Sequence, residues 1–233
     1  MVVLAVVAVV SGALLIGAAW GIYGALPRRL EGFLIAVAGG ALVLSLVSEL
    51  IQPAVEQVSL HYAMGAVAAG AIAFAGLDWL VDEYWGGGSG GGLLVAITLD
   101  GVPENLALGV ALIGASPLAV AALAGSIFLS NLPEAAGGAR EMVTDGRSKR
   151  AVLALWAATA ALLSGAAIAG NLLLHDAAPG TLAVIRCFAA GAVVASLATE
   201  VFPKAYREDH HMAGVATALG LVLAFLLGEL GPG

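Results

Sequence analysis

Residues 36–54 read AVAGGALVLSLVSELIQPA, and residues 187–205 read CFAAGAVVASLATEVFPKA. Aligned with an offset of 151 residues, the two stretches share identical residues that include a glutamate, Glu49 in the first and Glu200 in the second. Other identical pairs include Ala38/Ala189, Gly40/Gly191, Ala41/Ala192, Ser45/Ser196, Leu46/Leu197 and Ala54/Ala205. Both stretches are rich in Ala, Gly and Val, so chance similarity is the alternative, but the shared acidic residue favours an internal repeat.

The composition around these stretches is that of a membrane protein. Of the 233 residues, 61% are hydrophobic and only 11% are charged, whereas a soluble domain carries about a quarter charged residues. Glycine is abundant, and small residues let transmembrane helices approach closely. The net charge of −7 and the absence of a basic stripe argue against nucleic acid as a partner. The single cysteine, Cys187, excludes a disulfide framework and a cysteine metal cage.

The apolar runs predict a single all-α domain over residues 1–233 that is embedded in a lipid bilayer. A spanning helix needs about 20 mostly apolar residues, and the chain contains eight such runs with short connections. The predicted helices cover residues 2–24, 32–52, 61–82, 93–114, 118–141, 151–174, 181–204 and 212–230.

The basic residues predict the orientation of these helices. If all eight span, eight of the nine Lys and Arg residues lie at the links after the first, fifth and seventh helices, which share one side. The exception is Arg186. By the positive-inside rule that side is cytoplasmic, so both termini are expected outside. The acidic, Arg-over-Lys composition favours a prokaryotic cell membrane.

The two aligned stretches fall in the second and seventh helices, which cross the membrane in opposite directions. Such inverted repeats are common in secondary transporters. A second match, with an offset of 30, aligns residues 99–104 (LDGVPE) with residues 129–134 (LSNLPE) in the neighbouring fourth and fifth helices. The predicted architecture is therefore three helices, a central pair and three inverted helices.

The central pair carries acidic residues near its middle. Asp100 and Glu104 are four residues apart and share one helix face. Glu134 lies in the fifth helix, and Ser130 and Asn131 precede it on the same face. Charged groups at membrane depth are costly and usually functional.

Two prolines add oxygen ligands to this region. Pro103 and Pro133 have no backbone N–H, so the carbonyls of Leu99 and Leu129 lose their helical partners. Neither helix carries a Lys, Arg or His at the depth of the acids, so the carboxylates either stay protonated or bind a cation. An oxygen-rich set of this kind suits a divalent metal ion. A proton relay, or structural acids that stay protonated, is the alternative.

Further acidic and histidine residues lie towards the ends of the helices. Glu49 lies near the outer end of the second helix, and Glu200 lies near the inner end of the seventh. The inverted repeat predicts that they line the outer and inner openings of one path. The alternative is a pair of acids at the membrane interface. His210 and His211 follow in the cytoplasmic link, where they would collect metal leaving the path unless they only make a polar loop.

These residues resemble the ZIP family of zinc and iron transporters, especially its compact bacterial GufA-like branch. That family has eight helices, both termini outside and a three–two–three inverted arrangement. Its fourth-helix motif, similar to His-Asn-x-Pro-Glu-Gly, corresponds to residues 100–105 (DGVPEN), and its fifth-helix Pro-Glu motif corresponds to residues 130–134 (SNLPE). The Glu-x-x-Pro of its seventh helix corresponds to residues 200–203 (EVFP).

The chain departs from that pattern in its ligands. Asp100 stands where the family has histidine, Gly101 follows it in place of asparagine, and Ser130 takes the polar position of the fifth helix. The sixth helix has no acidic ligand, and only Ser164 and Asn171 are polar candidates. The resemblance therefore implies a metal site reduced to Asp100, Glu104 and Glu134, with Asn131 and Ser130 assisting. Loss of the nitrogen ligand favours harder ions such as Mn²⁺.

The sequence thus predicts a transporter that moves divalent metal ions (Zn, Mn, Fe, Co or Cd) towards the cytoplasm. The metal is the substrate, and no prosthetic group is expected. An enzyme is not expected, because no HExxH motif is present. The alternatives are a proton-coupled transporter of another substrate and a ZIP-like protein with altered or lost transport. The expected partners are the lipid bilayer and the metal ion. The sequence does not decide between a monomer and a homodimer.

Overall fold

The structure is a computed structural model that describes residues 2–24, 26–85, 90–114 and 120–229. Inside its helices, the side chains of residues 2, 82, 85, 90–97 and 100 are not described. The described residues are almost entirely helical and form no strand, so the all-α prediction is confirmed for them. The helices are α1 (Val2–Tyr23), α2 (Arg28–Leu46), α3 (Gln52–Val55), α4 (Leu60–Trp85), α5 (Gly90–Ala111), α6 (Ala121–Thr144), α7 (Lys149–Leu174), α8 (Pro179–Ser196), α9 (Phe202–Glu208) and α10 (Ala213–Glu229).

Each of the eight predicted ranges overlaps a helix or an unbroken series of helical segments, and residues 118, 119 and 230 of these ranges lie outside the described part of the chain. The second range overlaps α2, a π-helical segment η1 (Val47–Ile51) and the start of α3. The seventh overlaps in the same way α8, the π-helical segment η2 (Leu197–Val201) and the start of α9. The lengths of the apolar runs gave no sign of the two π segments.

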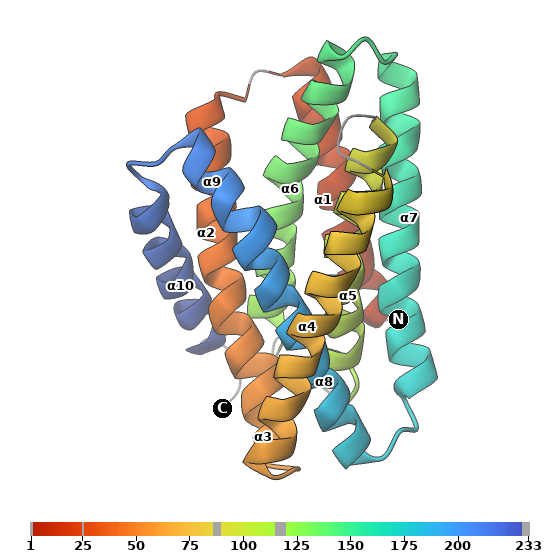
Figure 1. The fold of residues 1–233 in the computed structure, drawn as a ribbon, viewed down its shortest axis with the longest axis vertical. Helices are drawn as coiled ribbons and strands as arrows, with labels where there is room; N and C mark the ends of the chain where they lie inside the picture. The colour runs from red at the N-terminus through yellow and green to blue at the C-terminus, as the bar shows by residue number, and fades with distance from the viewer. Residues whose placement is uncertain (1, 25, 86–89, 115–119, 230–233) are drawn as a thin grey trace.

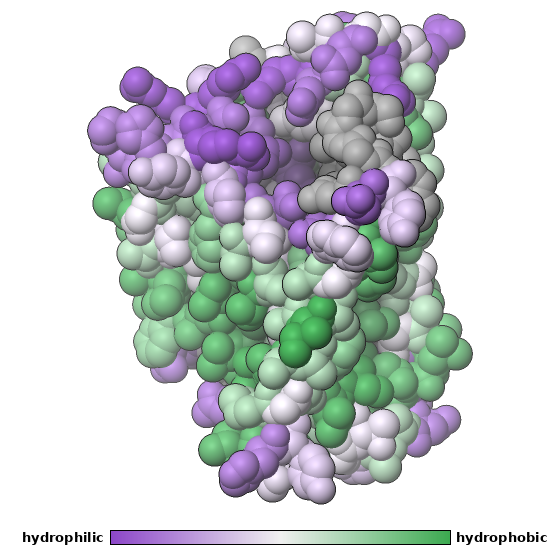
Figure 2. Space-filling view, viewed as in Figure 1, coloured by the Kyte–Doolittle hydropathy of each residue, from purple (hydrophilic) through white to green (hydrophobic). Residues whose placement is uncertain are grey.

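Five of the described helical runs are long and apolar enough to cross a membrane. They cover residues 3–23, 28–55, 60–81, 149–174 and 179–208, and α10 is a shorter apolar helix. Figure 2 shows the consequence on one face of the molecule, where hydrophobic side chains form a broad belt and hydrophilic ones gather at the upper end. A surface of this kind is suited to lipid contact along its middle and to water at its ends.

The helices run roughly along the long axis of an elongated bundle (Figure 1). The connections from α1 to α2, from α6 to α7 and from α9 to α10 lie towards the upper end in this view, and both termini lie in the lower half. These three connections are the ones that carry the clustered basic residues. The bundle therefore has a basic end, which also proves to be the end at which its main cavity opens.

Glycines hold pairs of helices in backbone contact. A Cβ atom at Gly40 of α2 would collide with a backbone carbonyl of α10, and one at Gly220 of α10 would collide with a carbonyl of α2. The same reciprocal arrangement joins Gly191 of α8 and Gly70 of α4. Gly40 and Gly191 are aligned positions of the sequence repeat, so aligned helices make the same kind of crossing with different partners.

The pairs α1–α6 and α7–α5 are also joined in similar ways. Gly21 of α1 packs against a carbonyl of α6, and Gly109 of α5 packs against a carbonyl of α7. In each pair an asparagine amide bonds to the backbone of the partner helix: Asn131 Nδ2 donates to the Val10 carbonyl at 3.2 Å, and Asn171 Nδ2 donates to the Gly109 carbonyl at 2.9 Å.

The two π segments have a common cause in the prolines that follow them. Pro53 and Pro203 each lie near the start of the next helical segment, where they lack an N–H and crowd the preceding turn. The N–H groups of Gln52 and Phe202 reach back five residues to the carbonyls at positions 47 and 197. A π-bulge places one extra residue in a turn and is frequent at functional sites. Here the turns contain Glu49 and Glu200.

Arg186, the basic residue outside the clusters, lies on α8 and closes the end of α5. Its Nη2 donates to the carbonyls of Val110 and Ile113 at 3.3 and 3.4 Å. These carbonyls belong to the last turn of α5 and to the residues just after it, where the helix has no partners of its own. Arg186 therefore caps a helix instead of contacting either mouth of the predicted path.

The glycine crossings lead to a stability prediction. Gly40→Ala and Gly191→Ala should each destabilise the protein by about 1–3 kcal/mol, because the added methyl must push two helix backbones apart. Gly65→Ala in α4 is the matched control, since its Cβ would meet nothing within 4 Å. Thermal unfolding of the purified variants in one detergent would measure the difference. Equal melting temperatures for all three variants would contradict the close crossings.

Candidate functional site

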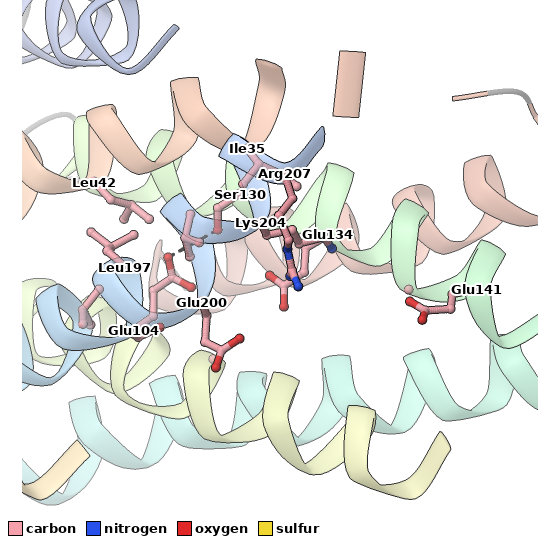
Figure 3. A pocket seen from close by; sticks show the side chains of 15 residues that line it. Ile35, Leu42, Glu104, Ser130, Glu134, Glu141, Leu197, Glu200, Lys204 and Arg207 are labelled. Atoms are coloured by element: carbon pink, nitrogen blue, oxygen red, sulfur yellow. Dashed lines mark hydrogen bonds between the residues drawn. The ribbon is translucent and has the colours of Figure 1, made fainter. Parts of the chain in front are cut away.

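A cavity lies between α2, α5, α6, α8, η2 and α9, and acidic side chains from three elements point into it (Figure 3). Its volume is about 120 Å³. Glu104 of α5, Glu134 of α6 and Glu200 of η2 line it, together with Ser130. Its closed end is formed by Leu42, Val193 and Leu197, which belong to the largest apolar cluster of the core.

Glu104 is placed by the interior of α5. It follows Pro103, which remains inside the helix, and its side chain is only 7% exposed. Ser130 Oγ of α6 donates a hydrogen bond to Glu104 Oε1 at 3.5 Å, which links the two helices across the cavity. Gly101, one turn earlier, lines the wall, and a Cβ there would crowd the side chain of Leu163. The Pro-Glu motif thus puts its carboxylate on the cavity side of the helix.

Glu134 lies one turn after Ser130 on the same side of α6. It lines the cavity together with Glu200 and Lys204. The structure therefore brings together Glu104, Glu134 and Ser130, as the sequence predicted. It also brings Glu200 into the same cavity, where the sequence had placed it at a separate inner mouth.

Other predicted site residues lie elsewhere. Asn131 is buried but is not a cavity-lining residue, because its amide binds the backbone of α1. The side chain of Asp100 lies outside the described part of the chain. Glu49 lies half-buried in η1 and does not line the cavity. His210 and His211 are exposed between α9 and α10, with ring centroids 4.0 Å apart, and do not line the cavity either.

Sequence reasoning missed the cations of the cavity. Lys204 and Arg207 of α9 line it beside the carboxylates. From the sequence, α5 and α6 themselves offer no counter-charge at the depth of the acids, and Lys204 and Arg207 are expected in a cytoplasmic link. The sequence does contain an indication that a cation lies beside Glu200, because Lys204 follows it by four residues. If the helix continues past Pro203, that spacing puts both side chains on one face.

A buried ion cluster lies next to the cavity, and sequence reasoning gave it no role. Glu31 of α2 is only 2% exposed. Its Oε2 pairs with Arg140 Nη2 at 2.7 Å, and its Oε1 lies 3.6 Å from Lys204 Nζ. Arg140 Nη1 also donates to the Leu26 carbonyl at 2.6 Å. The cluster therefore ties α2, α6 and α9 together at the basic end of the bundle.

The backbone of α6 makes room for this cluster. A Cβ atom at Gly137 would collide with the carboxylate of Glu31. Any other residue at this position would push the carboxylate away from Arg140 and Lys204. The glycine thus allows an acidic side chain from α2 to lie directly against the α6 backbone.

A second hollow continues from the cavity to the basic end. Its lining mixes cationic and acidic side chains, and it shares Glu141, Lys204 and Arg207 with the cavity. The other charged residues that line it are Arg28, Arg29, Glu31, Arg140, Asp145 and Glu208. In Figure 2 the upper end of the molecule is correspondingly hydrophilic. The carboxylates are therefore connected to the basic end of the bundle, while the apolar cluster lies on their other side.

The described carboxylates alone do not form a closed metal cage. In the part of the chain whose side chains are described, no three His, Cys, Asp or Glu residues come together closely enough to hold a metal ion. The Asp100 side chain, the third predicted carboxylate ligand, lies outside that part. The donors in reach of one another are carboxylate and hydroxyl oxygens, which suit hard divalent cations better than soft ones.

Compared with known proteins, the chain matches no protein-family model and no curated protein.

The ion cluster leads to a prediction about stability. Arg140→Met should destabilise the protein by about 2 kcal/mol, because a buried carboxylate and a backbone carbonyl both lose a charged donor. Arg150→Met is the matched control, since Arg150 is exposed at the start of α7. Denaturation followed by circular dichroism in detergent would measure both. A loss for Arg140→Met no larger than that of the control would show that the cluster adds no stability.

Proposed function

We propose that this chain is a membrane transporter that carries divalent cations of the Zn, Mn and Fe type towards the cytoplasm. The observation that carries the proposal is the convergence of Glu104, Glu134 and Glu200 on one cavity, inside a helix bundle with an apolar exterior. Ionised carboxylates at such a depth are costly unless a cation neutralises them. The resemblance of the Pro-Glu motifs to the ZIP family points to the same function.

The proposed architecture is eight spanning helices in a three–two–three arrangement with inverted repeats. It is supported by the glycine crossings, which join α2 to α10 and α8 to α4 in the same way. It is also supported by the π segments, which occur within one residue of aligned positions in the second and seventh predicted helices. The central pair is then α5 and α6, which supply Glu104 and Glu134.

The charge of the cavity supports a divalent substrate. Its described lining contains four carboxylates and two cationic side chains, so it has an excess of two negative charges when all are ionised. The carboxylates are Glu104, Glu134, Glu141 and Glu200, and the cations are Lys204 and Arg207. One divalent cation would balance this excess. Oxygen donors from Glu104, Glu134 and Ser130 would replace part of its hydration shell.

The mechanism we propose uses the cavity in an inward-facing state. The cation would arrive from the side of Glu49, bind at Glu104 and Glu134, and leave past Glu200 into the basic hollow. The apolar cluster beyond Leu42 and Val193 would close the outer path in this state. Rocking of one repeat against the other would then open the site to the outside.

A proton-linked transporter of an anionic substrate is the second candidate. The presence of Lys204 and Arg207 in the cavity favours it, because two cationic side chains provide a binding site for a carboxylate or phosphate group. In that case Glu104 and Glu134 would carry protons instead of ligating a metal. The two candidates differ in which ion accumulates in vesicles.

The first test is uptake into liposomes that hold the purified protein. Zn²⁺, Mn²⁺, Fe²⁺, Co²⁺ and Cd²⁺ should be compared in parallel at equal concentration. We expect saturable uptake of at least one ion. In the Glu104→Gln/Glu134→Gln double variant uptake should fall to the leak of empty vesicles, because both charged ligands are lost. Glu83→Gln is the control, since Glu83 is exposed near the end of α4 and away from the cavity.

Each result has a distinct meaning. Uptake that survives in the double variant would place the metal site elsewhere. If no ion enters vesicles shown to be tight, the cation proposal is rejected. Proton movement in those vesicles that depends on an added organic anion would then establish the second candidate.

A further inference from the structure

We propose that Glu141 lets divalent cations pass between the cavity and the hollow at the basic end, by offsetting the positive charge of Arg207 where the two spaces meet. This inference rests on the proposed function and adds to it the residue that controls how fast the cargo enters and leaves the site.

The cavity and the hollow meet at charged side chains. Among the described residues they share Glu141, Lys204 and Arg207, and we call these three residues the junction. An ion that moves directly between the two spaces therefore passes beside one carboxylate and two cationic groups. The cavity has a volume of about 120 Å³ and the hollow one of about 730 Å³, so the junction separates a small site from a much larger space.

Glu141 is placed at the junction by the helix that also supplies Glu134. It follows Glu134 by two helical turns, which is a rise of about 10 Å along α6. Ser130, Glu134 and Glu141 fall on one face of this helix, and all three line the cavity. Figure 3 shows Glu141 beyond Glu134 along the helix. Glu141 therefore lies between the deep carboxylates and the basic end.

The two cations of the junction are not equivalent. The Lys204 ammonium lies 3.6 Å from Oε1 of Glu31, a carboxylate that also pairs with Arg140, so much of its charge is already compensated. Arg207 and Glu141 are exposed, and within the described residues neither forms an ion pair. Loss of Glu141 would therefore leave the charge of Arg207 unopposed at the junction.

The charge of the junction affects how easily a divalent cation crosses it. The Coulomb energy is proportional to the product of the charges, so Arg207 repels a divalent ion twice as strongly as a monovalent one. A carboxylate at a similar distance attracts the ion to the same extent, and rings of acidic side chains favour cations in pores in this way. Glu141 thus lowers a barrier to passage without being a ligand of the deep site.

The test is the initial rate of Mn²⁺ and Zn²⁺ uptake into liposomes that hold the full chain, at two salt concentrations that are equal inside and outside. At an ionic strength of about 0.15 M we expect Glu141→Gln to lower the rate about fivefold, because a charge close to the ion is only partly screened. At about 1 M the difference should shrink to about twofold or less, because the screening length falls to about 3 Å.

Two further variants identify the cause. Asp209→Asn is the matched control, because it removes one negative charge from the same end of the bundle and Asp209 lines neither the cavity nor the hollow. Its rate should stay within about twofold of that of the unmodified protein. Arg207→Gln should raise the rate. The double variant Glu141→Gln/Arg207→Gln should return close to the unmodified rate, because two opposite charges are lost together.

A binding measurement separates passage from ligation. Mn²⁺ affinity of the full chain in detergent micelles can be read from the electron paramagnetic resonance signal of free Mn²⁺ at the lower ionic strength. We expect Glu141→Gln to change the affinity less than about twofold, because a charge about 10 Å away is largely screened there. An affinity that falls as far as the uptake rate would show that Glu141 is a ligand or a structural residue, and would overturn the inference.

The outcomes separate the two proposals. Equal uptake rates for Glu141→Gln and Asp209→Asn at the lower ionic strength would overturn the role of Glu141 and leave the transport proposal standing. If the unmodified protein takes up neither Mn²⁺ nor Zn²⁺ into tight vesicles, the proposed function is rejected and this inference with it. A slow Glu141→Gln variant whose rate is restored by Arg207→Gln would support both.

Discussion

Backbone contact between helices at glycine is the feature on which the rest of this structure depends. At Gly40, Gly191 and their partners, no side chain separates the two helix backbones, so the helices approach more closely than larger residues would allow. This contact is made by α2 with α10 and by α8 with α4. The close packing of these outer pairs leaves α5 and α6 to face α2 and α8, and the cavity lies between them.

Charge inside the bundle is the second constraint. Carboxylates from α5, α6 and η2 share a space with Lys204, and Glu31 lies just beyond it with Arg140. In a low-dielectric interior such groups are stable only when their charges balance locally. The pairing of Glu31 with Arg140 meets this need, whereas the described lining of the cavity keeps an excess of two negative charges when all its groups are ionised.

The prolines connect these two constraints. Pro103 and Pro133 interrupt the hydrogen bonding of α5 and α6 one residue before the glutamates that line the cavity. Pro53 and Pro203 follow the π segments that contain Glu49 and Glu200. Each of these prolines therefore removes a backbone donor close to a glutamate, and three of the four glutamates, Glu104, Glu134 and Glu200, line the cavity.

The approximate positions of the helices could be predicted from the sequence, because apolar length and glycine content are local properties. The placement of Ser130 and Glu134 on one face of their helix follows in the same way from helical geometry. Which charged side chains meet depends instead on how the helices pack. Lys204 and Glu31 are far apart in the chain, and their contact requires that α9 and α2 pack against α6. The π segments could not be predicted either, because a single added residue in a turn leaves the apolar pattern almost unchanged. The length of an apolar run is a property of one segment, whereas contacts between charges on different helices exist only after those helices have packed.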